Sequence, residues 1–199
     1  MDKKQLIESL ENQNFPEKIV DAFRKVRRED FVPLNYKEFA YADVPLPIGH
    51  GQTISQPYTI ASMLDLLELK DNLKILEVGS GSGYVLALIN RISANSEIYG
   101  VERIRELADS SKKILKGQKN IKIIVGDGSR GVREKAPFDR ILVSASSEEI
   151  PKELLKQLNG NGIMVCVVGN SVIKIKRTLK GDEIEEYPGF SFVPLVRGD

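Results

Sequence analysis

The 199-residue sequence has few of the residues that build metal and disulfide sites, with one cysteine, one histidine and no tryptophan. One cysteine cannot form a disulfide within the chain, and one histidine and one cysteine cannot form a zinc cluster, so we expect no metal site. The cysteine, Cys166, lies in the apolar run 163–168, where we expect a buried free thiol. A chain without disulfides fits a reducing, cytoplasmic location.

The sequence also lacks an excess of charge of one sign and a long apolar run. Lysine and arginine number 29 and aspartate and glutamate 28, a net charge of +1. This balance gives no electrostatic footprint for nucleic acid, so we expect no nucleic-acid partner. No run reaches the length that spans a membrane, and the charged N-terminal stretch MDKKQLIESLE does not resemble a signal peptide. We therefore expect no membrane partner.

Residues 74–84, KILEVGSGSGY, combine an apolar strand pattern, three glycines and the start of an apolar helical pattern. Strand, glycine turn and helix in this order are typical of the turn that cradles a nucleotide or nucleoside in an open α/β sheet. Glycine allows this close approach because it has no Cβ. A tight turn that binds nothing is the alternative interpretation.

Glu77 distinguishes this turn from a dinucleotide site. It precedes Gly79 by two residues, where the nicotinamide-binding pattern is apolar, and Tyr84 stands where that pattern has its third glycine. The form E-x-G-x-G-x-G resembles instead the first motif of class I S-adenosylmethionine (AdoMet) methyltransferases. A carboxylate here could face the cationic methionine end of AdoMet, whose product is S-adenosylhomocysteine.

Two further carboxylates follow later predicted strands. Glu102 closes the segment GVER about twenty residues after the glycines, where a carboxylate can accept hydrogen bonds from ribose hydroxyls. Asp127 lies between two glycines and could accept from an adenine amine. The alternatives are an exposed charge at a strand end for Glu102 and an Asx-type turn for Asp127.

Apolar strand patterns and helical patterns alternate from residue 74 onward. We predict strands at 74–78, 97–101, 121–125, 139–144 and 163–168, helices at 84–92, 105–115 and 152–158, and a turn at 159–162. Two more strands are predicted at 172–179 and 183–196. The sequence therefore predicts an α/β fold of the Rossmann-like class I methyltransferase type, a mostly parallel twisted sheet flanked by helices, with an antiparallel C-terminal strand.

The first 56 residues differ from the rest. Two packing helices are predicted, at 3–11 and from Phe15-Pro16 to Val26, followed by a charge cluster at 27–30 that we interpret as a solvated face or a helix end. Residues 31–56 show no steady period and are interpreted as a cover over a binding cleft, with His50 as a solvated loop residue. Ser55 is the predicted N-cap of the next helix. We expect one methyltransferase domain, 1–199, with 1–56 supplying the N-terminal helices and substrate cleft and 57–199 the AdoMet-binding core.

The motifs exclude several methyl acceptors. Amino-directed methyltransferases carry an Asn/Asp-Pro-Pro-aromatic motif after the fourth strand, and Ser144 to Ser147 offers nothing similar. No evident strong base is present. A carboxylate acceptor, with a pKa of about 4, is already ionised at pH 7 and needs no base. Hydroxyl and carboxylate acceptors therefore fit better than amines.

Residues 40–57, AYADVPLPIGHGQTISQP, resemble the protein L-isoaspartate (D-aspartate) O-methyltransferase family. ILEVGSGSGY, YGVER, GDGSRG, FDRILVSA with EIP, and FVPL look like the remaining family motifs in order, over roughly Val26 to Leu195. Departures are Ser144-Ala145-Ser146, Arg105 and Val196, which affect substrate detail more than activity.

This resemblance implies methyl transfer from AdoMet to the α-carboxylate of L-isoaspartyl residues in damaged proteins, which starts repair through a succinimide. Whether D-aspartyl residues are also substrates is left open. Ser55 is the implied catalytic residue, donating to the substrate carboxylate. The implied substrate-binding residues are Asp43, Pro45, Ile48, Thr53, Ile54 and Ser55. The implied cofactor-binding residues are Glu77, Gly79, Ser80, Gly81, Gly83, Glu102, Arg103, Asp127 and Gly128.

Two other hypotheses are retained. One is an RNA methyltransferase, against which the even charge balance counts. The other is a module that binds AdoMet without turnover, which the intact segment around Ser55 disfavours. For the assembly we expect a monomer or small homo-oligomer.

Overall fold

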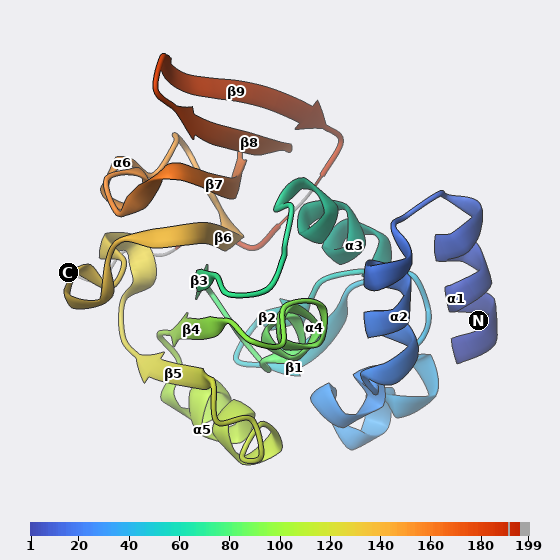
Figure 1. Ribbon diagram of the computed structural model, residues 1–199. Coiled ribbons are helices and arrows are strands. Elements are labelled where there is room, and N and C mark those ends of the chain that lie inside the picture. The colour runs from blue at the N-terminus through green and yellow to red at the C-terminus, as the bar shows by residue number, and fades with distance from the viewer. Residues whose placement is uncertain (191, 196–199) are drawn as a thin grey trace.

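The computed structural model describes residues 1–190 and 192–195, and its centre is a seven-stranded sheet (Figure 1). The strand order is β5-β4-β3-β6-β7-β8-β9. The strands are β3 (Lys74–Val78), β4 (Glu97–Glu102), β5 (Ile121–Val125), β6 (Phe138–Ser147), β7 (Leu158–Val168), β8 (Ser171–Thr178) and β9 (Gly181–Pro188). β3 to β7 pair in parallel, β8 runs antiparallel to β7, and β9 runs antiparallel to β8. The predicted fold class is confirmed.

The order of the strands reverses beside β3. The chain runs outward through β4 and β5 and then returns to place β6 on the other side of β3. The crossover helices are α4 (Tyr84–Ile92) and α5 (Arg105–Ile114), and the short α6 (Lys152–Leu155) precedes β7. In open α/β sheets the crevice at such a reversal, at the carboxyl ends of the strands, is where ligands bind. The glycine turn that follows β3 lies at this crevice.

The N-terminal part packs on one face of the sheet. It comprises α1 (Lys3–Asn12), α2 (Glu17–Lys25), two 3-10 turns (Arg28–Phe31 and Leu34–Phe39), the hairpin strands β1 (Leu46–Gly49) and β2 (Gln52–Ile54), and α3 (Pro57–Leu66). The 31–56 segment, predicted to be irregular, thus contains an antiparallel hairpin. His50 is exposed in its turn, as predicted.

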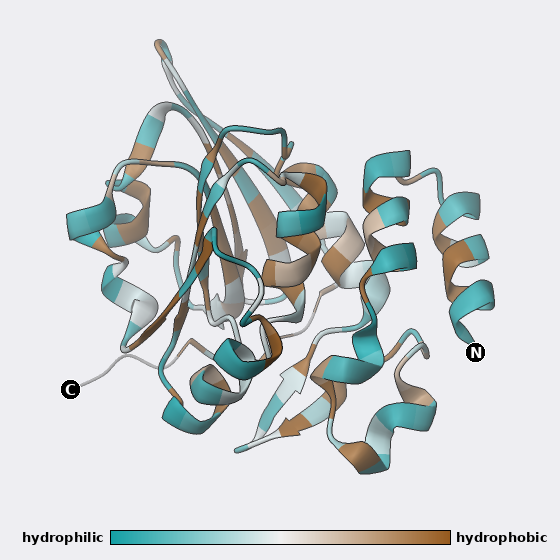
Figure 2. Ribbon diagram, turned by 60° about the horizontal axis from the view of Figure 1, so that its bottom comes forward, coloured by the Kyte–Doolittle hydropathy of each residue, from teal (hydrophilic) through white to brown (hydrophobic). Residues whose placement is uncertain are grey.

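Two apolar clusters fill the two faces of the sheet, and Figure 2 shows hydrophobic residues along the strands and on the inward sides of the helices. Successive residues of β3 face opposite sides, since Ile75 belongs to the cluster with α1 to α5 and Leu76 to the cluster with α6. Cys166 is a buried free thiol in the second cluster, as predicted, and burial raises its pKa to about 12.

Several predicted boundaries are wrong. The predicted turn at 159–162 lies within the bounds of β7, at an irregularity in its register between the pairs Phe138–Leu158 and Arg140–Ile163. α6 ends at Leu155 rather than residue 158. β9 ends at Pro188, whereas the prediction extended it to Val196, which lies outside the described residues. Residues 193–195 instead return to the end of β6, where the Ser146 N–H donates to the Val193 carbonyl at 2.8 Å.

The predicted N-cap of α3 is also wrong. α3 begins at Pro57 with Gln56 as N-cap, and the Gln56 side chain makes no capping bond. The Asp43 carboxylate, distant in sequence, accepts from the Tyr58 N–H at 2.8 Å. Asp43, which is distant in sequence, thus takes the place of a local N-cap, because the segment before the hairpin lies beside the start of the helix.

Candidate active site

The turn after β3 is held in a conformation that favours glycine. Gly79, Gly81 and Gly83 have φ values of +80°, +51° and +84°, in the left-handed region. The N–H groups of Gly79 and Ser80 both donate to the Val101 carbonyl, at 2.9 and 3.1 Å. The turn is therefore tied to the neighbouring strand β4, with its backbone facing the crevice.

Gly83 also has a packing requirement. A Cβ on Gly83 would lie 2.3 Å from the Ser111 Oγ, so the start of α4 could not approach α5 as it does. Gly81 in turn receives the Ile48 side chain, whose Cδ1 would lie 3.2 Å from an added Cβ. The hairpin and α5 thus enclose the turn from two directions.

Glu77 is a buried carboxylate whose two oxygens differ in their hydrogen bonding. Only 1% of the residue is exposed, and its Oε1 accepts from the Ser144 Oγ at 2.8 Å. Its Oε2 has no hydrogen-bond partner among the described residues. Burial raises the pKa of Glu77 to about 8, opposed by the Ser144 hydrogen bond and reinforced by the charge of Glu102. Such a group is poised for a cationic ligand, because buried charges are normally paired.

Glu102, at the end of β4, is fixed by the backbone around it. Its Oε2 accepts from the Gly81 N–H at 2.8 Å and its Oε1 from the Ile104 N–H at 2.9 Å. Each carboxylate oxygen can accept a further hydrogen bond. Glu102 thus joins the glycine turn to the second strand while retaining capacity for a hydroxyl-bearing ligand.

Three adjoining cavities lie between the hairpin, the carboxyl edge of the sheet and residues 192–195. We name each after one lining residue. The Glu77 cavity is lined by Glu77, Gly79, Ser80, Gly81, Ile48, Thr53, Ile54, Ser55, Tyr84, Leu142, Ser144 and Phe192, among others. The Glu102 cavity includes Glu102, Arg103, Gly128, Ile48, Gln52, Thr53, Gly79, Gly81, Ser144 and Val193 to Leu195. The Ser55 cavity is lined by Pro45, Thr53, Ser55, Gln56, Thr59, Ser144, Phe192 and Val193.

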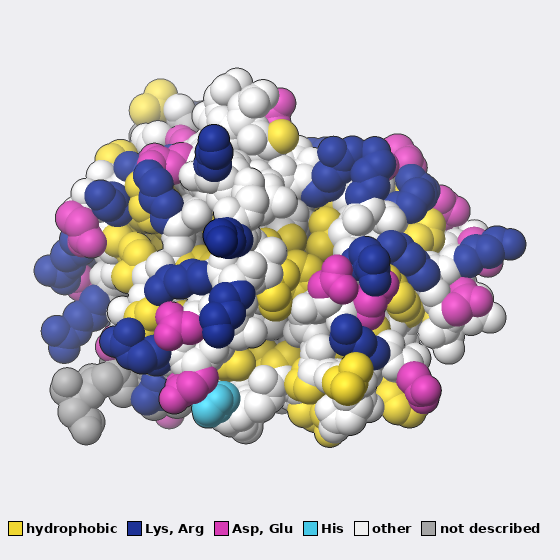
Figure 3. All heavy atoms as spheres, turned by 90° about the horizontal axis from the view of Figure 1, so that it is seen from below, with side chains coloured by type: hydrophobic (Ala, Val, Ile, Leu, Met, Phe, Trp, Pro, Cys, Tyr) yellow, Lys and Arg dark blue, Asp and Glu magenta, His cyan; other side chains and the backbone are white. Residues whose placement is uncertain are grey.

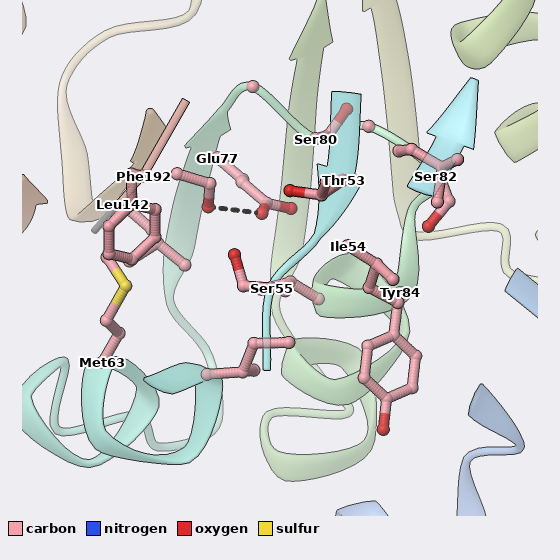
Figure 4. Close-up of a pocket in the computed structure, with 16 residues that line it drawn as sticks. Thr53, Ile54, Ser55, Met63, Glu77, Ser80, Ser82, Tyr84, Leu142 and Phe192 are labelled. Atoms are coloured by element: carbon pink, nitrogen blue, oxygen red, sulfur yellow. Dashed lines mark hydrogen bonds between the residues drawn. The ribbon is translucent and has the colours of Figure 1, made fainter. Parts of the chain in front are cut away.

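Most of the predicted site residues therefore come together. Thr53, in β2, lines all three cavities, and Ser55 lines two of them. Figure 4 shows the Thr53, Ser55 and Glu77 side chains directed toward one space, with Leu142, Met63 and Phe192 forming an apolar side. An acidic pocket and a pair of hydroxyls thus share a cavity.

Three predicted residues lie outside the described lining of these cavities. Gly83 packs against α5, and Asp43 caps α3. The Asp127 carboxylate accepts from the Ser129 N–H and Oγ, at 2.8 and 2.9 Å, which matches the Asx-turn alternative. Its neighbour Gly128 does line the Glu102 cavity.

Arg28 is a functional candidate that the sequence analysis missed, because the charge cluster at 27–30 was interpreted as a solvated face or a helix end. Arg28 is instead 0% exposed. Its two terminal nitrogens donate to four backbone carbonyls at 2.7 to 3.2 Å, those of Ala40, Ala42, Val44 and Ser55. Burial lowers its pKa. Arg28 thus joins the start of the hairpin segment to its end, directly at Ser55.

Ser144 and Phe192 are further residues that the sequence did not single out for the site. The β6–β7 register is irregular between Leu142 and Ser146, and Ser144 there reaches Glu77. Phe192 lines the Glu77 and Ser55 cavities. The only available signal was position, at the carboxyl end of a strand for Ser144 and in the FVPL segment for Phe192.

The other sequence-level exclusions concern the surface. Within residues 1–190 and 192–195, no helix is long and apolar enough to cross a membrane, and no group of three or more metal-ligating side chains is found. On the face shown in Figure 3, basic and acidic side chains are intermixed, with apolar side chains exposed between them.

Comparison with known proteins agrees along the whole chain. The protein-L-isoaspartate(D-aspartate) O-methyltransferase (PCMT) family profile matches residues 1–199. The chain is 45% identical over 197 residues to the protein-L-isoaspartate O-methyltransferase of Fervidobacterium nodosum, covering 96% of this chain and 99% of that protein. It is 44% identical over 201 residues to the Methanothrix thermoacetophila protein of the same name, covering 98% and 95%.

A solved structure extends this similarity to the fold. A Plasmodium falciparum protein of the same methyltransferase type, in complex with S-adenosyl-L-homocysteine, has a TM-score of 0.85 and 27% identity, with 100% of both chains covered. A second protein-L-isoaspartate O-methyltransferase structure has a TM-score of 0.88 and 25% identity, covering 99% of this chain and 66% of the other. By its full-length match, its close relatives and its fold, this chain belongs to the protein-L-isoaspartate(D-aspartate) O-methyltransferase family.

Proposed function

We propose that this protein transfers a methyl group from AdoMet to the α-carboxylate of L-isoaspartyl residues in proteins and so begins their repair through a succinimide. Family membership supports the activity. The observation that carries the proposal within the structure is that Glu77 and Ser55 line the same cavity. One end of that cavity suits the cation of the cofactor, and the other suits an anionic acceptor.

The cofactor would occupy the Glu77 and Glu102 cavities. The Oε2 of Glu77 is buried and has no hydrogen-bond partner among the described residues. A buried carboxylate oxygen of this kind needs a cationic partner, so the site fits the ammonium group of the cofactor. Glu102 and the positive-φ glycine turn suit the ribose and the close approach of a nucleoside. The further cofactor assignments, to Ser80, Arg103 and Gly128, rest on their positions in the lining of these cavities. Asp127 lies outside that lining, and its assignment rests on the family resemblance and on its neighbour Gly128.

The acceptor would enter through the Ser55 cavity. Ser55 and Thr53 present hydroxyl groups that can donate to a carboxylate and orient one of its oxygens. Pro45, Ile48 and Ile54 form apolar walls around them, while Asp43 acts indirectly through the start of α3. Orientation and exclusion of water, rather than proton transfer, are the contributions of this part of the chain.

The lining supports a carboxylate acceptor rather than an amine. Among the described residues of the Glu77 and Ser55 cavities, the ionisable side chains are Glu77 and Tyr84. Burial raises the pKa of Tyr84, so its hydroxyl stays protonated at neutral pH. AdoMet supplies an electrophilic sulfonium methyl group, and a carboxylate oxygen forms the new bond to that carbon as the carbon–sulfur bond breaks. No base is required, since the acceptor carboxylate is already ionised.

We also propose that residues 1–199 act as one domain, with 1–56 forming the cover and acceptor cleft and 57–199 holding the cofactor. A shared apolar cluster supports the single domain, because it contains residues of α1 and α2 together with residues of the sheet. We propose a monomer or small homo-oligomer that works in the cytoplasm.

The test is methyl transfer from labelled AdoMet to two matched peptides, one with L-isoaspartate and one with normal L-aspartate. We expect base-labile label on the isoaspartyl peptide alone, because the product is a carboxyl ester. A third peptide with D-aspartate would test the second substrate class. AdoMet binding without transfer to any of these peptides would contradict the proposal and favour a non-catalytic role, while base-stable label on RNA would favour the RNA hypothesis.

A further inference from the structure

A broad groove runs along the exposed side of α3. It lies between the turn after α1, the helix itself and the segment that ends β9, three parts that Figure 1 shows converging. Its volume is about 890 Å³, within the range of sites that bury sizeable ligands. Phe15 and Tyr58 line it and pack edge to face, with ring centroids 5.8 Å apart, and Tyr187 and Phe190 line it as well. We call this feature the α3 groove.

The α3 groove is continuous with the Ser55 cavity. Pro45, Gln56 and Thr59 line both. A substrate peptide whose reacting carboxylate lies at Ser55 would therefore pass over these shared residues into the groove. Aromatic and polar walls of this kind suit an extended peptide, because they bury side chains while leaving partners for its backbone.

The charge in the groove comes from Asp65, and no lysine or arginine is among its described lining residues. Glu186 also lines the groove, but it pairs with Ile173 of the other apolar cluster and accepts from the Ser171 Oγ at 2.6 Å, so its carboxylate lies on the opposite face of the sheet. Asp65 is exposed and has no ion-pair partner in the described part of the chain. The nearby cation Lys174 is held by Glu68 and Glu185, at 2.7 and 3.6 Å. The negative potential of the groove is therefore not neutralised by its neighbours.

We propose that the α3 groove seats the residues that flank the isoaspartyl residue, and that Asp65 favours substrates with lysine or arginine at those positions. This inference rests on the proposed function. Charge complementarity of this kind sets selectivity among substrates more than it adds affinity.

The length of α3 indicates which substrate positions are read. Asp65 lies eight residues beyond Pro57, roughly 12 Å along a helix that rises about 1.5 Å per residue. An extended peptide advances about 3.3 Å per residue and covers that distance in roughly four residues. A basic residue three or four positions from the isoaspartyl residue would thus lie near Asp65.

The test compares three isoaspartyl peptides of one length that carry lysine, alanine or glutamate at the third and fourth positions on both sides. We expect kcat/KM to be about three- to tenfold higher for the lysine than for the glutamate peptide at low salt, since exposed charge pairs contribute modestly. The ratio should shrink at 0.5 M salt because of screening. It should fall close to one in the variant Asp65→Asn, whereas Glu186→Gln, on the opposite face of the sheet, should keep it.

Glu134→Gln, at an exposed glutamate remote from the groove, is the matched control and should keep the wild-type ratio. Unchanged binding of S-adenosylhomocysteine would show that Asp65→Asn is folded. Equal kcat/KM for the lysine and glutamate peptides, or a ratio that survives Asp65→Asn, would overturn the groove inference alone if the alanine peptide is methylated. Absence of methylation of every isoaspartyl peptide would overturn the proposed function, and the groove inference with it.

Discussion

Glu77 joins two opposing requirements at the scale of a single residue. Its carboxylate is buried, and among the described residues only one of its oxygens is hydrogen-bonded, which disfavours the charged form in the free protein. The same arrangement favours the charged form once a cation lies against Oε2, because the pair is then shielded from water. Glu77 thus lowers the stability of the free protein and strengthens ligand binding, as is common where binding needs a buried charge.

Replacing Glu77 by Gln should weaken binding of S-adenosylhomocysteine by about ten- to a hundredfold. The reason is that a charge-assisted hydrogen bond, of about 1.5–3 kcal/mol, becomes a neutral one. Isothermal titration calorimetry measures this directly. Glu153→Gln, at a surface glutamate paired with Lys156, serves as the control and should bind normally. Equal affinity of E77Q and wild type would remove Glu77 from the cofactor site.

Glu77 also makes the stability of the fold fall as the pH rises. The pKa of Glu77 is raised from 4.5 to about 8 in the folded protein. Between pH 4.5 and pH 8 the Glu77 carboxyl is therefore protonated in the folded state and ionised in the unfolded state. Glu77 therefore destabilises the fold increasingly from pH 4.5 to 8, by about 1.4 kcal/mol per pH unit, and no further above pH 8.

Urea unfolding of wild type and E77Q at a series of pH values isolates this contribution. We expect the free energy of unfolding of wild type to fall relative to that of E77Q between pH 5 and 8, and the difference to level off above pH 8. A difference that rises with pH would mean that the pKa of Glu77 is lowered in the fold.

At the scale of elements, the hairpin segment depends on a single buried side chain. Arg28 gathers four carbonyls from residues 40, 42, 44 and 55. These groups belong to the two ends of the segment that carries β1 and β2. Without the guanidinium they would be left unsatisfied, which costs roughly 1–3 kcal/mol for each fully buried group. Arg28 is therefore a positioning residue for Ser55.

Arg28→Lys should lower kcat/KM for an isoaspartyl peptide by about tenfold and change S-adenosylhomocysteine affinity much less. Lysine keeps the charge, but its compact ammonium cannot reach both ends of the segment as the forked guanidinium does. Peptide kinetics and calorimetry on one preparation give the two quantities. Arg27→Lys is the matched control, since Arg27 is exposed and pairs with Glu29 and Asp30. Parallel loss of peptide and cofactor binding would indicate general unfolding instead.

At the scale of the whole molecule, the cavities lie where three distant parts of the chain meet. The hairpin comes from the first quarter of the chain, the glycine turn from its middle and residues 192–195 from its end. A ligand there contacts all three, so it links segments that only the tertiary structure brings together. Binding to the folded state alone adds about 2.7 kcal/mol of stability at a ligand concentration of 100 Kd.

Saturation with S-adenosylhomocysteine should therefore slow amide hydrogen exchange in three segments at once, residues 46–54, 79–83 and 192–195. The physical reason is that local opening of any one of them must release the ligand. Hydrogen-exchange mass spectrometry with and without ligand makes the comparison. The hairpin of β8 and β9, at the edge of the sheet and outside the lining of these cavities, provides the internal control and should exchange unchanged. Protection confined to 79–83 would show that the cover and the C-terminal segment do not contact the ligand.

Sequence patterns were sufficient wherever an interaction is local. The alternation of strands and helices, the glycine turn and the carboxylates at strand ends could all be predicted, because the carboxyl ends of parallel strands meet at one edge of the sheet. Errors arose where distant partners outweigh local preference. The turn predicted at 159–162 is an irregular stretch within β7, because pairing with β6 on both sides of it holds the strand together, and the cap of α3 came from Asp43 rather than Ser55.

The sequence by itself determined the fold class and the family, since periodicity and short motifs are properties of contiguous residues. The tertiary structure decided which groups complete the site. It buried Arg28 beneath the hairpin, brought Ser144 against Glu77 and returned Phe192 to the cavity wall. These contacts depend on closing long loops around a packed sheet, and neither burial nor distance across such a loop is encoded in the spacing of neighbouring residues.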